Sequence, residues 1–294
     1  MIPTTMPPRV LADHKQIRTI AITAIFSDDV LYEKVAFKGG NALSLVHAIG
    51  IRTSLDLDFS IEGDFNDPEE IERRTLKALT ERYEAAGYSV FDFKFGRRPT
   101  IPRAGQDRRW GGYMVTFKLM EKVKYESVKQ DLAAAQRDAL VIGPDEQRVF
   151  TIDLSKYEYT TGKVQVEVDD YTIFVYSPEM IVIEKLRAIC QQMPEYLQKL
   201  GKPRARDFFD IHSVLSNRDI DLGSAVNLDL AKNIFAAKQV PLGLIVKIAV
   251  QREFHRPDWD SVRASTPEAI EGFDFYFDFV VERTMQSMHP LWKE

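Results

Sequence analysis

The stretch "FKGGNALSLVHAIGIRTSLDLDF", residues 37–59, places two aspartates inside a segment that otherwise has the pattern of a buried strand. Residues 55–61 alternate between apolar and polar types, which is typical of a β-strand with one buried face. In such a strand Asp56 and Asp58 project to the same side, while the large apolar residues between them face the core. The sequence therefore predicts two carboxylates close together on one face of a sheet.

Two neighbouring carboxylates raise each other's pKa unless a cation lies between them. Mg²⁺ suits such a pair, because it typically takes one or two carboxylates together with waters and phosphate oxygens. Asp153 is a third acid on another alternating segment, residues 149–157, and is well placed to complete a two-metal site for in-line phosphoryl chemistry. Asp56, Asp58 and Asp153 are thus the predicted metal ligands. An exposed strand face with solvated acids is the alternative, since a D-x-D motif is short and common.

The glycine pair Gly39-Gly40 follows a short apolar strand at residues 35–37 and precedes a helical pattern at residues 41–49. Glycines at a strand-to-helix turn let backbone amides approach a phosphate, and the helix adds its positive end. A simple tight turn is the alternative. Together with the D-x-D strand, the turn favours a site that holds a triphosphate at one end and its bridging metal at the other.

Two further candidates, Lys185 and Asp207, lie in the second half of the chain. Lys185 belongs to the apolar helix "PEMIVIEKLRAIC", residues 178–190, where an unpaired ammonium is costly to desolvate. A phosphate would satisfy it, and Glu184 or a snorkelling side chain is the alternative. Asp207 lies at the start of "RDFFDIHSVL" with Asp210 on the same helix face. It is either a helix N-cap or an acid that orients Lys185 or the nucleotide.

The composition of the 294-residue chain is that of an ordinary globular protein, with 45% hydrophobic and 28% charged residues and room for two domains. No apolar run reaches the roughly 18 residues of a membrane span, and the start lacks the order of a signal peptide, so we expect a cytoplasmic protein. Cys190 is the single cysteine, which excludes an internal disulfide. A net charge of −5 argues against a protein that coats nucleic acid by bulk charge.

A change of pattern near Ser177 divides the chain, because strand and helix patterns alternate before it and helical patterns follow it almost throughout. We expect an α/β (α+β) part, residues 1–176, and a helical domain, residues 177–294, that contributes Lys185 and Asp207. The predicted strands are 35–37, 55–61, 88–95, 112–120, 149–157, 164–168 and 171–176. The predicted helices are 9–31, 41–49, 68–86, 125–139, 178–193, 204–215, 228–237, 242–251 and 267–285.

Four ordered blocks within residues 35–215 resemble the AbiEii-type nucleotidyltransferases, which are the toxin halves of the bacterial AbiE and MenAT toxin–antitoxin systems. They are distant relatives of the DNA polymerase beta superfamily. The blocks are "KGGNAL" from Lys38, residues 52–58 ending in Asp-Leu-Asp, "SPEMIVIEKLRAIC" around Lys185, and "RARDFFDIHSVL" around Asp207. One position departs from the pattern: Asn41 stands where relatives usually carry Ser or Thr. Its amide still donates hydrogen bonds, so the departure concerns nucleotide preference more than catalysis.

The resemblance implies a nucleotidyltransferase core with a mixed sheet flanked by helices, and a Mg²⁺-dependent reaction that uses NTP. It implies that the two glycines hold the triphosphate, that the D-x-D acids ligate Mg²⁺, and that Lys185 binds nucleotide phosphate. The implied catalytic residues are Asp56, Asp58, Lys185 and Asp207. The implied nucleotide-binding residues are Lys38, Gly39, Gly40, Asn41 and Lys185.

The resemblance also implies a substrate, because characterised relatives add nucleotides to the 3′ end of tRNA and so block translation. The basic loops at residues 97–109 and 202–206 are then candidate tRNA contacts, with Trp110 stacking on a base; solvated loop charge is the alternative. The implied partner is an antitoxin of winged-helix type encoded nearby, in a phage-defence setting. Two other functions stay open: transfer to a protein side chain, as in AMPylation, and a non-catalytic module that binds RNA or a partner.

Overall fold

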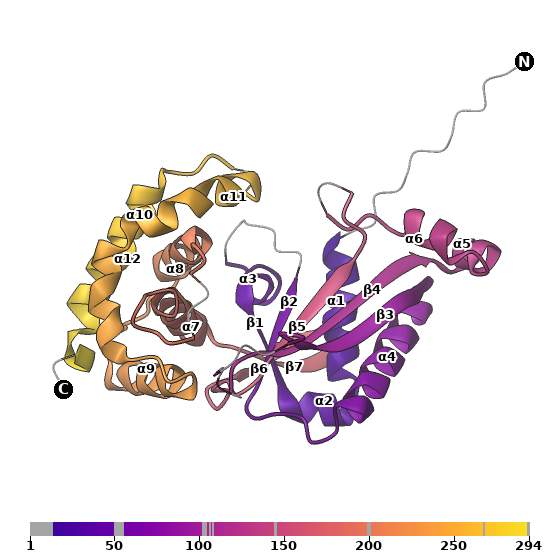
Figure 1. The fold of residues 1–294 in the computed structure, drawn as a ribbon, viewed down its shortest axis with the longest axis horizontal. Coiled ribbons are helices and arrows are strands. Elements are labelled where there is room, and N and C mark those ends of the chain that lie inside the picture. Colours follow the sequence, from indigo (N-terminus) through magenta and orange to yellow (C-terminus); the bar gives the residue numbers. More distant parts are fainter. Residues whose placement is uncertain are drawn as a thin grey trace, which may run out of the picture.

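The structure is a computed structural model, and it describes residues 14–49, 56–101, 105, 107, 109–143, 146–198, 201–266 and 268–292. Residues 50–55 of the D-x-D loop, and residues 102–104, 106 and 108 of the first basic loop, therefore lie outside the described residues. Figure 1 shows two parts: a twisted sheet with helices against it, and a group of helices from the C-terminal half of the chain.

Seven strands form one mixed sheet in the order β3-β4-β5-β2-β1-β7-β6. Strand β1 pairs antiparallel with β2 and parallel with β7, and β2 pairs parallel with β5. The strands are β1 Val35–Lys38, β2 Leu57–Ile61, β3 Tyr88–Arg98, β4 Gly112–Glu121, β5 Phe150–Ser155, β6 Val164–Val168 and β7 Tyr171–Val175. Each coincides with a predicted strand, so the predicted mixed sheet is confirmed.

The N-terminal helices pack on this sheet, with α1 (His14–Phe26) and α4 (Pro68–Ala85) also against each other. Two predicted helices are each divided by an aspartate that caps a new one, because its carboxylate accepts hydrogen bonds from backbone amides in the next turn. Asp28 caps α2 (Asp29–Lys34) in this way, and Asp131 separates α5 (Lys122–Val128) from α6 (Leu132–Arg137). The predicted helix 41–49 is instead α3 (Gly39–Asn41) followed by a π-helical turn, Ala42–Val46.

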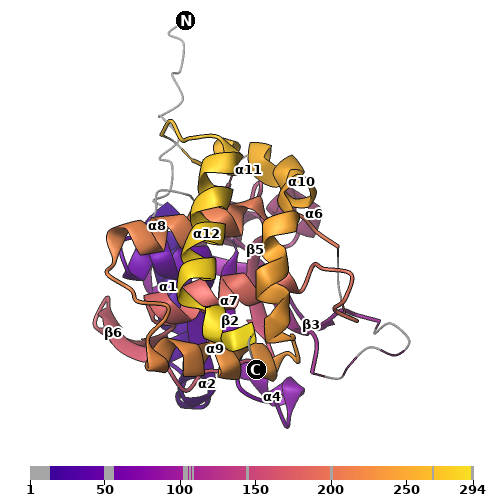
Figure 2. The same ribbon diagram turned by 90° about the vertical axis from the view of Figure 1, so that its left-hand side faces the viewer.

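The C-terminal part is helical throughout its described residues, and Figure 2 shows it facing the viewer. Its α-helices are α7 Pro178–Cys190, α8 Ala205–Asn217, α9 Ala225–Ala237, α10 Arg252–His255, α11 Trp259–Ala264 and α12 Phe273–Ser287. Three 3₁₀ segments, Leu242–Val250, Arg256–Asp258 and His289–Trp292, complete it. The predicted helix at 242–251 is present as a 3₁₀ segment, Leu242–Val250, and α10 and α11 were not predicted.

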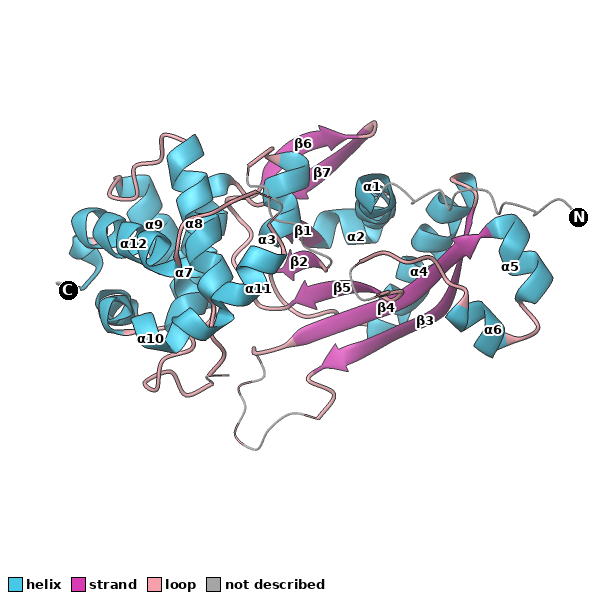
Figure 3. Ribbon diagram, turned by 90° about the horizontal axis from the view of Figure 1, so that it is seen from above, coloured by secondary structure: helices cyan, strands magenta, loops and turns pink. Residues whose placement is uncertain are grey.

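Helix α7 is the central element of this part, because it contacts α8, α9 and the 3₁₀ segment Leu242–Val250. In Figure 3 the helical part lies beyond the end of β5, next to β1 and β2. One cluster of buried hydrophobic side chains extends through both parts, from Ile17 in α1 to Leu291 near the C-terminal end. A small second cluster, around Phe91 and Ala135, lies under α5 and α6. The division into domains at residue 177 stays a prediction.

No single helix among the described residues is long and apolar enough to cross a membrane. By length and composition alone, the bent pair formed by α9 and the following 3₁₀ segment Leu242–Val250 passes the same test, with an angle of 93° between the two.

Candidate active site

Three adjacent strands bring Lys38, Asp58 and Asp153 side by side. Lys38, the last residue of β1, is the register partner of Asp58 in the antiparallel pairing of β1 with β2. Asp58 in turn pairs with Asp153 across the parallel β2–β5 ladder. Residues directly opposite each other in a ladder carry side chains on the same face of the sheet. The sheet thus places a cation and two carboxylates in one row, and Asp56 lies just before β2 on the same strand path.

The glycine turn is shaped around Asp58. Gly39 has φ of +78°, in the left-handed region, and a Cβ placed on it would lie 2.4 Å from Asp58 Oδ2. Only glycine fits such a position without moving the carboxylate or straining the backbone. Asn41 lies buried in the same turn, where its side-chain Nδ2 donates a 2.7 Å hydrogen bond to the backbone carbonyl of Asp56. The turn and the D-x-D segment are therefore in direct contact.

A cavity of about 730 Å³ opens between the sheet and helices α7 and α8. With the exception of Asn41, every predicted site residue lines it, although these residues come from six separate elements and from the residue before β2. The predicted residues on its wall are Lys38, Gly39, Gly40, Asp56, Asp58, Asp153, Lys185 and Asp207. Asn41 instead lies behind the wall, bound to Asp56, and its role in nucleotide binding stays a prediction.

The carboxylates of the cavity repel each other. Burial, followed by the neighbouring Asp153, raises the pKa of Asp58 to about 7, and Lys38 offsets part of this rise. Partial desolvation and Asp153 also raise the pKa of Asp56, while Arg98 lowers it. A raised pKa means that the site favours either a proton or another cation on these oxygens.

The donor set of Asp56 and Asp58 fits Mg²⁺, because this ion is commonly held by one or two carboxylates and completed by substrate phosphates. Within the described part of the chain, no three His, Cys, Asp or Glu side chains are grouped so as to hold a metal ion by themselves. Asp153 also has other partners: Arg98 NH1 contacts its Oδ2, and Ser155 Oγ donates to its Oδ1 at 3.4 Å. A metal here would therefore complete its coordination with waters or substrate oxygens, and Asp153 as a third ligand stays a prediction.

Lys185 is buried and held between two carboxylates. Its Nζ lies 3.0 Å from Asp207 Oδ1 and 2.7 Å from Asp210 Oδ2. Arg204 contacts the other oxygen of Asp207. Although burial raises the pKa of Asp207, Arg204 and Lys185 hold that pKa well below its usual range. Of the two interpretations of Asp207, the structure supports contact with Lys185, because the N-cap position of α8 is taken by Arg204.

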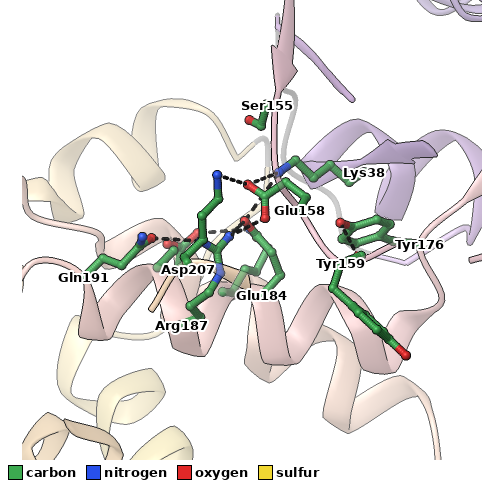
Figure 4. A network of polar contacts seen from close by, with 12 residues as sticks. Lys38, Ser155, Glu158, Tyr159, Tyr176, Glu184, Arg187, Gln191 and Asp207 are labelled. Atoms are coloured by element: carbon green, nitrogen blue, oxygen red, sulfur yellow. Dashed lines mark hydrogen bonds and ion pairs between the residues drawn. The ribbon is translucent and has the colours of Figure 1, made fainter. Parts of the chain in front are cut away.

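Glu184 was predicted as an alternative partner of Lys185. It belongs instead to another cluster that lines the cavity, and Figure 4 shows this cluster. Glu158, which follows β5, lies 3.5 Å from Lys38, 3.2 Å from Arg187 and 3.4 Å from Lys238. Glu184 lies 3.6 Å from Lys38 and 2.7 Å from Arg187. These five residues form the buried charge cluster, which joins β1 and the loop after β5 to α7 and to the end of α9.

The buried charge cluster contains three cations and two carboxylates. Burial raises the pKa of Glu158, but Arg187, Lys38 and Lys238 outweigh it and bring this pKa down to about 2. Burial, with the nearby Arg187 and Lys38, lowers the pKa of Lys238 to about 8, although Glu158 acts in the opposite direction. The buried charge cluster lines the cavity, and its surplus of positive charge is suited to an anionic substrate there.

The sequence did not identify Glu158, Arg187 or Lys238 as site residues; Arg98 was predicted within a basic loop, and Glu184 as an alternative partner of Lys185. Glu184 and Arg187 flank Lys185 on an apolar helix, where any charged residue needs a buried partner, so this signal was present. Both predicted basic loops reach the cavity. Their lining residues are Arg98, Trp110, Lys202, Arg204 and Arg206.

The chain belongs to the AbiEii family of nucleotidyltransferase toxins, because the family described as "Nucleotidyl transferase AbiEii toxin, Type IV TA system" matches residues 20–279. It is therefore a nucleotidyltransferase toxin of a toxin–antitoxin system, with an NTP as substrate and an antitoxin as partner. The recognition of this family and of an enzyme from the four sequence blocks is confirmed.

Three solved structures are similar at low sequence identity. A proposed nucleotidyltransferase from H. pylori is 17% identical, with a TM-score of 0.45, over 98% of each chain. MenT4, a nucleotidyltransferase toxin from Mycobacterium tuberculosis, is 15% identical, with a TM-score of 0.43, over 92% of this chain and 81% of its own. An antigenic nucleotidyltransferase-like protein from Paracoccidioides brasiliensis is 14% identical, with a TM-score of 0.38, over 88% of this chain and 96% of its own. A comparison with curated protein sequences gave no match.

Proposed function

We propose that this toxin transfers a nucleotide from NTP to the 3′ end of tRNA and thereby blocks translation. One observation carries the proposal: the acid row Asp58–Asp153 lies in a cavity whose rim is basic on both sides. Arg98 and Trp110 come from the β3–β4 side, Lys202 comes from the segment before α8, and Arg206 lies in the first turn of α8. Arginine and lysine at such a rim suit the phosphates of an RNA end, and an indole ring suits an unstacked base.

In the proposed reaction the 3′-hydroxyl oxygen attacks the α-phosphorus of NTP and pyrophosphate leaves. Asp56 and Asp58 would hold Mg²⁺, which when bound supplies charge neutralisation at the phosphates and alignment of the two reactants. The Gly39–Gly40 turn presents backbone to the triphosphate without an intervening side chain. The buried charge cluster gives the base of the cavity a positive charge toward the same phosphates. Lys185 and Asp207 form the wall contributed by α7 and α8.

The remaining expectations belong to the same proposal. Transfer to tRNA requires NTP and tRNA in the same compartment, so we place the reaction in the cytoplasm. We propose that the antitoxin is of the winged-helix type and encoded nearby, and that residues 1–176 and 177–294 act as the nucleotidyltransferase core and the helical domain. Asn41, bound to the carbonyl of Asp56, is the position to vary when nucleotide choice is examined.

The direct test is incubation of the protein with each labelled NTP, total tRNA and Mg²⁺, followed by separation of the RNA. We expect label on tRNA from at least one NTP, and none with Asp58→Ala. Asp138→Asn is the matched control, because it changes an exposed aspartate at the end of α6 that does not line the cavity. No transfer from any NTP would contradict the proposal. Label on protein bands instead of RNA would favour a protein acceptor, and absence of Mg²⁺-dependent NTP binding would favour a non-catalytic module.

A further inference from the structure

Arg98 lies at the end of β3, and its guanidinium reaches over the neighbouring strand ends to the acid row. Its NH1 contacts Oδ2 of Asp153, with side chains 56% and 21% exposed respectively. The other oxygen, Oδ1, accepts a 3.4 Å hydrogen bond from Ser155 Oγ. Both oxygens of Asp153 thus have partners, and the stronger partner is a cation whose side chain is still largely in solvent.

The contact between Arg98 and Asp153 places a positive charge beside two neighbouring carboxylates, those of Asp153 and Asp58. Asp153 is the register partner of Asp58, and its negative charge disfavours the charged form of Asp58. Lys38 compensates Asp58 from the other side, but it is also tied to Glu158 and Glu184 in the buried charge cluster. Among the described residues, Asp153 is the one carboxylate in ion-pair contact with Arg98. Arg98 thus contacts one carboxylate, whereas Lys38 and Lys185 each contact two.

We propose that Arg98 is a displaceable counter-ion of Asp153, and this inference rests on the proposed function of the site. Before substrate binds, Arg98 neutralises and orients Asp153. A metal–nucleotide complex, when bound, would supply the positive charge for these carboxylates, and the Arg98 guanidinium would then contact a substrate phosphate, whose oxygens arginine can bind in a bidentate manner. Arg98 is thus a positioning residue that acts through Asp153. It contacts Asp153 in the empty site and a substrate phosphate in the loaded site.

The test measures Mn²⁺ binding, by the loss of the free-ion EPR signal, in the absence of nucleotide and RNA. We expect Arg98→Gln to bind Mn²⁺ about three- to fivefold more tightly than wild type, in keeping with the strength of a partly exposed ion pair. Arg97→Gln is the matched control, because it removes the same charge from the preceding residue, whose guanidinium lies over the Tyr113 ring instead. Arg98→Lys should stay within about twofold of wild type, because it restores the charge.

A second set of measurements tests whether the effect of Arg98→Gln depends on Asp153. In an Asp153→Asn background, Arg98→Gln should no longer change Mn²⁺ affinity, because the carboxylate for which the two cations compete is absent. With a non-hydrolysable NTP analogue and Mg²⁺, Arg98→Gln should bind the analogue about threefold more weakly than Arg97→Gln, because the phosphate loses its arginine. Far-UV circular dichroism melting confirms that each variant is folded.

Three results would overturn the proposal: equal Mn²⁺ affinity of Arg98→Gln and Arg97→Gln, a gain that persists with Asp153→Asn, or no Mn²⁺ binding by any variant. Each of them is distinguishable from failure of the proposed function, because the labelled-NTP assay with tRNA reports on the transfer reaction independently of Arg98. A wild-type protein that labels tRNA while the Mn²⁺ measurements fail would keep the function and reject the displaceable counter-ion.

Discussion

Two separate features of the structure require glycine at position 39. Its φ of +78° is unfavourable for any residue with a Cβ, and the space for that atom is taken by Oδ2 of Asp58 at 2.4 Å. The second feature links the glycine turn to an acid of the D-x-D motif. A side chain at position 39 would therefore disturb the Asp58 carboxylate and the backbone together.

We expect Gly39→Ala to lower the free energy of unfolding by about 1–3 kcal/mol, because alanine in this conformation is strained. The displaced carboxylate should reduce nucleotide transfer by about tenfold or more, since small shifts of a reacting group are costly. Urea unfolding and the labelled-NTP assay measure the two effects. The control is Gly63→Ala in the loop after β2, where a Cβ would meet no atom within 4 Å. Equal losses in both variants would contradict this explanation.

At the level of elements, helix α7 positions more of the site than any single strand. Ser177 caps it by accepting a hydrogen bond from Met180 N at 3.3 Å, and Pro178 occupies its first turn. It is buried on nearly all sides, as expected of a helix with apolar residues all round. Its charged residues Glu184, Lys185 and Arg187 are consequently all tied to buried or half-buried partners.

Removal of the Lys185 charge by Lys185→Met should lower the free energy of unfolding by about 3–5 kcal/mol, because Asp207 and Asp210 would stay buried without their shared cation. A lysine whose main role is to bind substrate phosphate would instead lower nucleotide affinity with little effect on stability. Lys77→Met on α4 is the control, since that lysine is 73% exposed and its pair with Glu81 is worth about 0.5 kcal/mol or less. Chemical unfolding and nucleotide binding, measured on the same variants, separate the two roles.

The elements of the sheet could be predicted from the sequence because alternation is a local signal. All seven strands, and the position of Asp58 within one of them, follow from the spacing of apolar residues. Helix boundaries were less predictable: Asp28 and Asp131 interrupt patterns that look continuous, because a carboxylate that caps a helix also fits a polar position within one. The segment Leu242–Val250 has the apolar spacing of an α-helix, but it forms the tighter 3₁₀-helix, whose hydrogen bonds join residues i and i+3.

The charged partners could not be predicted in the same way. Arg98 and Asp153, or Lys38 and Glu158, are brought together by the order of strands in the sheet, and no local pattern records that order. The presence of Lys185 in an apolar helix did indicate that it needs a partner, and Asp207 was one of the predicted alternatives. The packing of α7 against α8 adds Asp210, so that Asp207 and Asp210 both contact the ammonium.

At the scale of the whole molecule, the buried charge cluster joins the sheet to the helical part by ion pairs, as the continuous hydrophobic core joins them by apolar contacts. Glu158 is its centre, because it is the carboxylate that contacts Lys38 from the sheet as well as Arg187 and Lys238 from the helical part. Loss of this one negative charge leaves three buried cations with a single carboxylate, Glu184. Both parts of the molecule should then be destabilised together.

We expect Glu158→Gln to lower the free energy of unfolding by about 3 kcal/mol at pH 7. Its folded-state pKa of about 2 lies below the ordinary value of 4.5, so the contribution of Glu158 is fully present above about pH 4.5 and is lost as pH falls toward 2. The difference between wild type and Glu158→Gln should therefore be constant from pH 7 to 5 and shrink below that. The control is Glu84→Gln, whose side chain is 47% exposed and 3.6 Å from Lys122. A pH-independent difference would contradict this account.

The same cluster limits how this protein can exchange parts with its relatives. Recombination at residue 177 would leave Lys38 and Glu158 in one parent's segment and Glu184, Arg187 and Lys238 in the other's. A chimaera whose second parent carries different charges at these positions would bury an unbalanced set at the joint between its two halves. Successful exchanges should then be those in which the five residues travel together or match, so the sheet and the helical part are expected to be inherited as one unit.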